Sequence, residues 1–224
     1  MMRKLFVFLS LVVLIGCSGR NNRSCDNSAL YGYVNICLPQ INGMTECRVH
    51  PNIQQLTQQY LASGPVLGYY LNNETYKQID KVAEPSAITY QDYFMIYGDY
   101  QRENYNATER DLELMEKSLE QALFEGRNFE QISSRIEEAY GTIVAGQPAL
   151  LEKYSPQKNV RTMIVLMKYK NEDSETSVIS AVDCILLKNR LINLAYYVTY
   201  GGGKSIDLVK EKNNEVIRKL MEIN

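Results

Sequence analysis

A glycine-rich segment near the end of the chain has the residue types of a phosphate site. Tyr200-Gly201-Gly202-Gly203-Lys204-Ser205 lies between an apolar stretch and an amphipathic one, and phosphate-binding loops surround their ligand with glycine amides and a lysine. The first glycine that such a loop requires would fall at residue 198, which is Val198. We therefore expect a flexible connection in which Ser205 caps the next helix, and we predict no cofactor.

His50 and a group of acidic residues have side chains that can bind protons or metals. His50 is the only histidine, and no serine or cysteine motif surrounds it, so it is predicted to be a polar loop residue near a helix start. Glu172, Asp173 and Glu175 lack the Asp and Gly spacing of a calcium-binding loop. We predict a solvated hairpin tip there, no metal site and no enzymatic activity.

The thiol of Cys17 is the strongest candidate for covalent modification. Arg3 and Lys4 precede an apolar run at 5–14, which is shorter than the roughly 20 residues that a membrane-spanning helix needs. The segment Leu14-Ile15-Gly16-Cys17 resembles the lipobox of bacterial lipoproteins, in which the cysteine is acylated and the chain is cleaved before it. The resemblance implies a signal peptide at 1–16 and a lipid anchor on Cys17.

The residues that follow Cys17 indicate a compartment. Positions 18–28 are polar and contain no aliphatic residue, so we interpret residues 17–29 as a lipidated tether. Ser18 is not the Asp associated with retention in the inner membrane, and the tether has no acidic cluster of the kind that suggests display on the cell surface. The expected location is the outer membrane, facing the periplasm.

Export also changes how the other cysteines are interpreted. Cys25, Cys37, Cys47 and Cys184 would lie in an oxidising compartment, where four thiols allow three complete pairings. Cys37 and Cys47 flank a turn-like segment at 39–43, so that disulfide is the most economical pairing. Cys184 lies in an apolar strand and is expected to be a small buried hydrophobe. Without any Cys-x-x-Cys motif, metal binding is a poor alternative.

Composition limits the remaining choices. The chain has 24 Lys plus Arg and 26 Asp plus Glu; removal of Arg3 and Lys4 with the signal peptide leaves 22 against 26, a net charge of -4. Because the basic residues are interspersed with acids, no nucleic-acid partner is expected. The part after the tether is long enough to bury about 70% of its unfolded surface in one core. We predict a single domain at 30–224.

Apolar patterns predict an alternation of strands and helices. Strands are expected where β-branched and aromatic residues run or alternate, at 31–38, 44–49, 66–71, 93–97, 162–169, 177–187 and 191–200. Helices are expected where apolar residues recur at spacings of three and four, from Pro51 to Gly64, at 108–126, at 129–140 and at 205–223. The last strand is apolar at its even positions and at Leu191, Ala195 and Tyr197, so the sheet should be covered on both sides.

Both ends of the predicted domain at 30–224 carry motifs that resemble a known fold. Gly32-Tyr33-Val34-Asn35-Ile36-Cys37-Leu38-Pro39 is similar to the opening strand of the PsbP-like fold, which the photosystem extrinsic protein shares with the Mog family. Lys188-Asn189-Arg190, the strand ending at Tyr200 and the closing helix resemble its end. The resemblance implies an α+β fold, with an antiparallel sheet between helices in an α/β/α sandwich. It also implies an accessory or scaffold role and brings no catalytic residues.

Tyrosines crowd the first half of the chain, and among them Tyr97, Tyr100 and Tyr105 could form a partner surface. Tyrosine combines a large apolar area with a polar tip, which suits interfaces and also suits the edge of a core. The sequence therefore favours a lipid-anchored, non-enzymatic module that binds an envelope protein or helps to assemble a complex. The alternative is a small-ligand binder or hydrolase whose site is built from dispersed residues. A concave pocket with convergent polar groups would favour that alternative.

Overall fold

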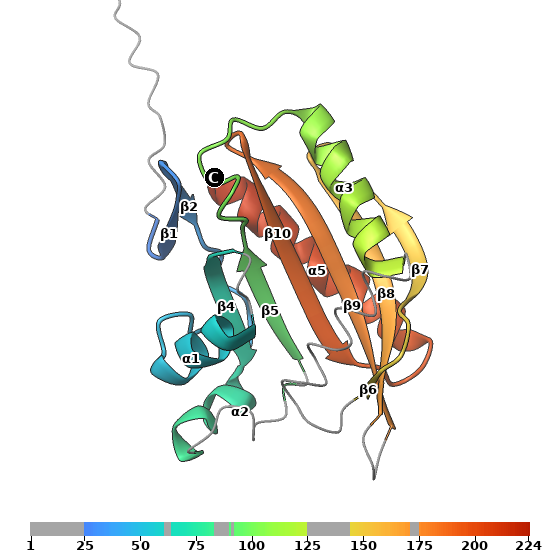
Figure 1. The fold of residues 1–224 in the computed structure, drawn as a ribbon. Helices are drawn as coiled ribbons and strands as arrows, with labels where there is room; N and C mark the ends of the chain where they lie inside the picture. The colour runs from blue at the N-terminus through green and yellow to red at the C-terminus, as the bar shows by residue number, and fades with distance from the viewer. Residues whose placement is uncertain (1–24, 61–63, 83–89, 91, 125–143, 171–174) are drawn as a thin grey trace, which may run out of the picture.

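The computed structural model describes residues 25–60, 64–82, 90, 92–124, 144–170 and 175–224. The described chain is a mixed α+β protein whose main element is an eight-stranded antiparallel sheet, with strand order β3-β4-β5-β10-β9-β8-β6 and with β7 also paired to β8 (Figure 1). The strands of this sheet are β3 (Met44–Glu46), β4 (Val66–Asn72), β5 (Asp92–Tyr97), β6 (Val144–Ala145), β7 (Ala149–Tyr154), β8 (Val160–Lys170), β9 (Glu175–Leu187) and β10 (Arg190–Thr199).

The centre of the sheet is formed by its three longest strands. β8 pairs with β9 along its whole length, and β9 pairs with β10 through a tight turn at Lys188 and Asn189. Both turn residues have positive φ, 49° and 59°, which is the backbone of a type I′ hairpin. This region matches the strands and the turn that the sequence predicted.

Two helices pack against β9 (Figure 1), and alternate side chains of β9 and β10 belong to two different buried clusters. Helix α5 (Lys204–Ile223) packs against one set, which includes Ile185, Ile192 and Leu194. Helix α3 (Glu109–Phe124) packs with Leu112 against the intervening positions, Cys184 and Leu191. The apolar spacing in the sequence predicted the positions of both helices, because each presents residues three and four apart to the sheet.

A second group of short helices packs near β4 and β5. These are α1 (Pro51–Tyr60), α2 (Asn73–Tyr76) and the 3₁₀ helix η1 (Ile79–Lys81). Ile53 and Leu56 of α1 and Ile79 of η1 are buried with Tyr69, Leu71 and Met95 of the two strands. The helix expected from Pro51 is present.

The first predicted strand differs from the structure. Residues expected to form one strand at 31–38 form instead a separate hairpin of β1 (Ser28–Tyr31) and β2 (Val34–Cys37). Gly32 turns the chain with φ +57°, and a Cβ there would clash with the carbonyl oxygen of Glu103, so the turn needs glycine. The strand expected at 44–49 pairs with β4 and not with this hairpin.

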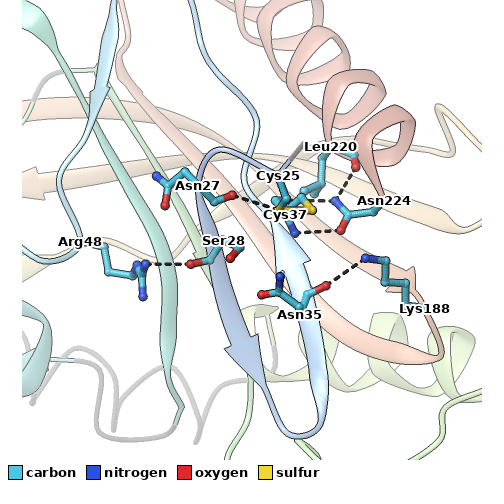
Figure 2. Close-up of a disulfide and its surroundings, with 9 residues drawn as sticks. All are labelled: Cys25, Asn27, Ser28, Asn35, Cys37, Arg48, Lys188, Leu220 and Asn224. Atoms are coloured by element: carbon cyan, nitrogen blue, oxygen red, sulfur yellow. Dashed lines mark hydrogen bonds between the residues drawn. A yellow bond between two sulfur atoms is a disulfide. The ribbon is translucent and has the colours of Figure 1, made fainter. Parts of the chain in front are cut away.

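The disulfide predicted between Cys37 and Cys47 is wrong. Cys37 is bonded to Cys25, with their Cα atoms 5.4 Å apart (Figure 2), whereas Cys47 is a free, buried thiol. The physical reason is the pairing of β3 with β4, which places Cys47 against Tyr69, whose carbonyl oxygen accepts its thiol hydrogen bond at 3.3 Å. Burial raises the pKa of this thiol to about 12. Cys184 is buried and free, as expected.

The folded region begins before the predicted domain boundary at residue 30. Cys25 is fixed by the disulfide, and the backbone carbonyl of Asn27 accepts a hydrogen bond from the amide of Leu38. The signal peptide at 1–16, Cys17, the tether up to residue 24, the helix expected at 129–140, and Glu172 and Asp173 lie outside the described residues. No helix in the described ranges has both the length and the apolarity needed to cross a membrane.

Candidate functional site

Exposed apolar side chains gather at the connection between β5 and α3. Tyr100 and Tyr105 of this connection are 57% and 52% exposed, and Leu114 of α3 is 51% exposed. With Arg102, which lies between the two tyrosines in the sequence, they form what we call the loop surface. A hollow of about 280 Å³ is lined by Arg102, Tyr105 and Leu114, and a second, of about 250 Å³, is lined in part by Tyr100 and Val49.

The β1–β2 hairpin fixes one end of this connection. The hydroxyl of Tyr31, a residue only 1% exposed, donates to the carbonyl oxygen of Asp99 and accepts from its amide, both at 3.0 Å. Gly98 leaves room for the Tyr31 ring, which a Cβ at that position would strike. Burial raises the pKa of Tyr31, so its hydroxyl stays protonated and can donate.

Arg190 fixes the other end of the connection. Its guanidinium is buried, and Nη1 donates to the carbonyl oxygen of Tyr105 at 3.0 Å and to Oδ1 of Asn106 at 2.7 Å. The amide of Ala107 also donates to the carbonyl oxygen of Asn189 at 3.0 Å. Hydrogen bonds to a charged group contribute about 1.5–3 kcal/mol each. The backbone that carries Tyr105 is therefore held by the sheet.

Asp111 closes the turn that enters α3. Its Oδ2 accepts hydrogen bonds from the amide and the hydroxyl of Thr108 at 2.8 and 2.6 Å, and Oδ1 accepts one from the hydroxyl of Tyr105 at 3.2 Å. The bonds from Thr108 lower the pKa of Asp111, and the bond to Asp111 raises the pKa of Tyr105. These polar groups at the first hollow are thus engaged with one another, which orients the Tyr105 ring.

Of Tyr97, Tyr100 and Tyr105, which the sequence suggested for a partner surface, the first lies in the sheet and the other two are exposed. Tyr69, Tyr93 and Tyr197 stack across β4, β5 and β10 with ring centroids 5.8 and 4.8 Å apart, and Tyr97 packs beside that cluster, partly buried. Tyr100 and Tyr105 are more than half exposed. Residue type alone could not separate them, because the difference depends on where β5 ends.

His50 links two short helices through both of its ring nitrogens. Its Nε2 lies 2.9 Å from Oδ1 of Asp80, and its Nδ1 accepts a hydrogen bond from the amide of Asn52 at 3.3 Å. The ring therefore joins the start of α1 to η1 and uses both nitrogens in doing so. A general base needs one nitrogen directed at a substrate or a nucleophile, and this arrangement provides none.

The glycine-rich segment is a helix entry. Helix α5 begins at Lys204, and the hydroxyl of Ser205 accepts a hydrogen bond from the amide of Gly201 at 2.9 Å. Ser205 therefore lies in the first turn, and the prediction that it caps the helix is wrong. Gly202 has φ +106°, which explains a glycine at that position. Among the residues that the structure describes, no group of three or more His, Cys, Asp or Glu could hold a metal ion.

Asp183 forms a buried polar cluster that the sequence analysis missed. Its side chain is fully buried between β9 and α5, and Oδ1 accepts hydrogen bonds from Thr162 at 2.5 Å and from Nδ2 of Asn213 at 3.1 Å. Burial raises the pKa of Asp183 to about 7, against the effect of these two bonds. The signal was available, because Asp183 interrupts an apolar strand between Val182 and Cys184.

The fold and the loop surface together define a class: a mixed α+β protein with a single main antiparallel sheet and an exposed aromatic connection beside it. The chain matches no protein-family model. It also matches no curated protein in sequence.

Two solved structures resemble the chain. One is a mutant of the protein Mog1, with a TM-score of 0.40 and 12% sequence identity over 88% of this chain and 94% of that chain. The other is the Saccharomyces cerevisiae Ran-binding protein Mog1p, with a TM-score of 0.36 and 12% identity over 88% of this chain and 93% of that one. Likeness at this level carries no function across, so function rests on the residues of this chain.

Proposed function

We propose that this protein is a membrane-anchored, non-enzymatic accessory factor of the bacterial envelope that binds another protein or helps to assemble a complex. The observation that carries the binding role is the loop surface, where Tyr100, Tyr105 and Leu114 are exposed beside Arg102 on a connection fixed at both ends. Its partner is an envelope protein.

The residue types of the loop surface favour a protein partner. Tyrosine and arginine are the types most often found at the energetic centres of protein interfaces, and two hollows beside Tyr100 and Tyr105 offer space for a partner's side chains. The connection is held by Tyr31 and Arg190 before any partner arrives. Little conformational entropy is then lost when the complex forms.

A non-enzymatic role is supported by the state of the polar side chains. Both nitrogens of His50 are engaged, and Asp111 at the first hollow accepts three hydrogen bonds. Asp183, whose pKa is raised by burial, is fully buried and lines neither hollow. These groups do not converge on a place where a substrate could react.

We also propose that the folded region, from residue 25 onward, is one PsbP-like domain with an α/β/α sandwich. The alternation of α3 and α5 contacts along β9 and β10 supports this architecture. The motifs at 32–39 and 188–200 support it as well.

The lipid anchor is proposed on Cys17, in the outer membrane and facing the periplasm. Support comes from Leu14-Ile15-Gly16-Cys17 after a ten-residue apolar core at 5–14, and from Ser18 directly after the anchor. Feeding cells a clickable fatty acid should label the wild-type chain and not the Cys17→Ser variant. Equal labelling of both would contradict the anchor, and recovery of the labelled chain in the inner-membrane fraction would contradict the predicted leaflet.

Photocrosslinking in intact cells tests the binding role. A benzophenone amino acid placed at Tyr105 is expected to give one dominant adduct with an envelope protein. The matched control places it at Leu208, which is exposed to nearly the same degree, 54% against 52%, but lies on α5. The same adducts at both positions, or none at Tyr100 and Tyr105, would contradict a protein-binding loop surface.

A further inference from the structure

We propose that the β1–β2 hairpin is a membrane-contact element, which places Tyr33 and Leu30 in the headgroup region of the lipid leaflet that holds Cys17. The inference rests on the proposed lipid anchor and goes beyond it, since an anchor alone leaves the orientation of the domain free. It assigns the hairpin a lipid surface as its partner, distinct from the protein partner of the loop surface.

The length of the tether keeps the hairpin close to the membrane. Cys25 follows Cys17 by eight residues, which at about 3.5 Å per residue reach at most about 28 Å. The disulfide joins Cys25 to Cys37 at the open end of the hairpin, so the tether is attached at that end. Each strand has four residues and is about 13 Å long, so Tyr33 at the turn also lies within reach of the bilayer.

The two faces of the hairpin differ in the way a membrane-contact element requires. Ala29, Tyr31 and Ile36 face the protein and are buried in the main core, which fixes the hairpin to the domain. Leu30 and Tyr33 are 71% and 87% exposed, the highest values among the large apolar residues that the structure describes. Transfer of leucine and tyrosine side chains from water to the boundary between headgroups and acyl chains is favourable.

The charges beside the hairpin suit an anionic lipid surface. Lys188 is exposed, and its Nζ donates to the carbonyl oxygen of Asn35 of β2 at 2.9 Å (Figure 2). Within the described ranges, Lys188 forms no ion pair with a carboxylate. Nη2 of Arg48 donates to the carbonyl oxygen of Ser28 at 3.2 Å on the opposite side of the hairpin, but Nε of Arg48 also lies 3.8 Å from Oε1 of Glu46. The basic charge that favours an anionic surface is therefore that of Lys188. A basic residue close to an anionic leaflet is attracted to it.

The absence of tryptophan from the chain allows a direct test. The Tyr33→Trp variant, purified as the mature lipidated protein, is reconstituted into vesicles of phosphatidylethanolamine and phosphatidylglycerol whose acyl chains are brominated near the headgroup. We expect a blue shift and a loss of roughly half of the fluorescence, because the indole lies at the boundary region that such lipids quench. Leu30→Trp should respond in the same way and provides a second reporter if one variant folds poorly.

The control reporter is Leu208→Trp, which is 54% exposed on α5. Asn224, at the other end of this helix, contacts Cys37, so Leu208 lies about 24 Å along the helix axis from the hairpin. It should be quenched no more by brominated than by ordinary lipids. Equal quenching at Tyr33→Trp and Leu208→Trp in lipidated protein would overturn the proposal. A response at Tyr33→Trp only after an envelope protein is added would also overturn it, because the occupant would be a protein.

Mass spectrometry of the mature N-terminus separates this proposal from the anchor on which it rests. A chain without acyl groups on Cys17 would refute the anchor. Both reporters would then be measured with the chain held on nickel-chelating vesicles through a histidine tag placed directly before residue 18. Quenching at Tyr33→Trp and not at Leu208→Trp would still support the hairpin contact, and equal signals would overturn it.

Discussion

At the scale of single residues, Asp183 couples the stability of the protein to pH. A neutral carboxyl group is favoured at this buried position, which raises its pKa to about 7 from the ordinary value of 3.8. Between these values the folded state binds more protons than the unfolded state. The contribution of Asp183 to stability is therefore fully present below about pH 4 and is lost as the pH rises towards 7.

The variant Asp183→Asn should remove this dependence. The amide keeps an acceptor for Thr162 and Asn213, and its nitrogen can donate to Oδ1 of Asn213, which has no hydrogen-bond partner among the described residues. Urea unfolding between pH 4 and pH 8 should show a variant that is more stable than wild type above pH 7 and less sensitive to pH. The control is Asp207→Asn, an exposed carboxyl of α5. A wild-type stability that rises from pH 4 to pH 7 in step with the Asp183→Asn variant would contradict the raised pKa.

The residues of the loop surface could be predicted from the sequence only in part. Tyr100 and Tyr105 were candidates by type, but Tyr97 was an equal candidate until the end of β5 placed it in the sheet. Arg190 was interpreted only as part of a turn, because its hydrogen bonds to Tyr105 and Asn106 join segments about 85 residues apart. Such contacts depend on the topology of the sheet and leave no local pattern.

At the scale of elements, the disulfide between Cys25 and Cys37 stabilises the hairpin. It closes a loop across a separation of 12 residues, and cross-links of this size contribute about 2–3 kcal/mol, mainly by restricting the unfolded chain. The Cys25→Ser variant should lose about that much stability in chemical denaturation. Dithiothreitol should reduce the stability of wild type by a similar amount and leave the variant unchanged. A larger effect of reductant on the Cys25→Ser variant than on a Cys47→Ala variant would contradict the pairing.

Individual elements were predicted correctly where an apolar pattern continues over many residues, and incorrectly where a turn lies within an apolar run. β9 and β10 alternate over ten or more residues and are joined by Lys188-Asn189, and α5 has a continuous apolar stripe. The β1–β2 hairpin was missed because its turn, Gly32-Tyr33, lies within an aromatic run. The wrong prediction of a Cys37–Cys47 disulfide followed from that error, because the pairing of β3 with β4 places Cys47 in the main sheet and not beside Cys37.

At the scale of the whole molecule, the end of α5 is joined to the hairpin that carries the disulfide. The side chain of Asn224 accepts from the amide of Cys37 at 2.9 Å and donates to its carbonyl oxygen at 3.0 Å (Figure 2). Two segments 187 residues apart thereby meet at the point where the tether enters the fold.

Replacing Asn224 by alanine should loosen this junction. The loss of about 1 kcal/mol per hydrogen bond should appear as faster hydrogen exchange at the amides of Cys37 and Ile36, with little change in β9. Glu222→Ala, an exposed substitution in the same helical turn, is the matched control. Uniformly faster exchange across the sheet, or an unchanged hairpin, would contradict a local role for Asn224.

The strand order has a consequence for how the chain acquires its structure. β5 pairs with β4 along one edge and with β10 along the other. Residues 193–198 of β10 are synthesised about 100 residues after residues 92–97 of β5. The hairpins β8–β9 and β9–β10 are local and form early, whereas closing the large loop between β5 and β10 is slow. The first half of the sheet therefore cannot be completed until nearly all of the polypeptide has been delivered. A chain threaded through a narrow translocation channel with its beginning first would not complete its sheet until its last strand had passed.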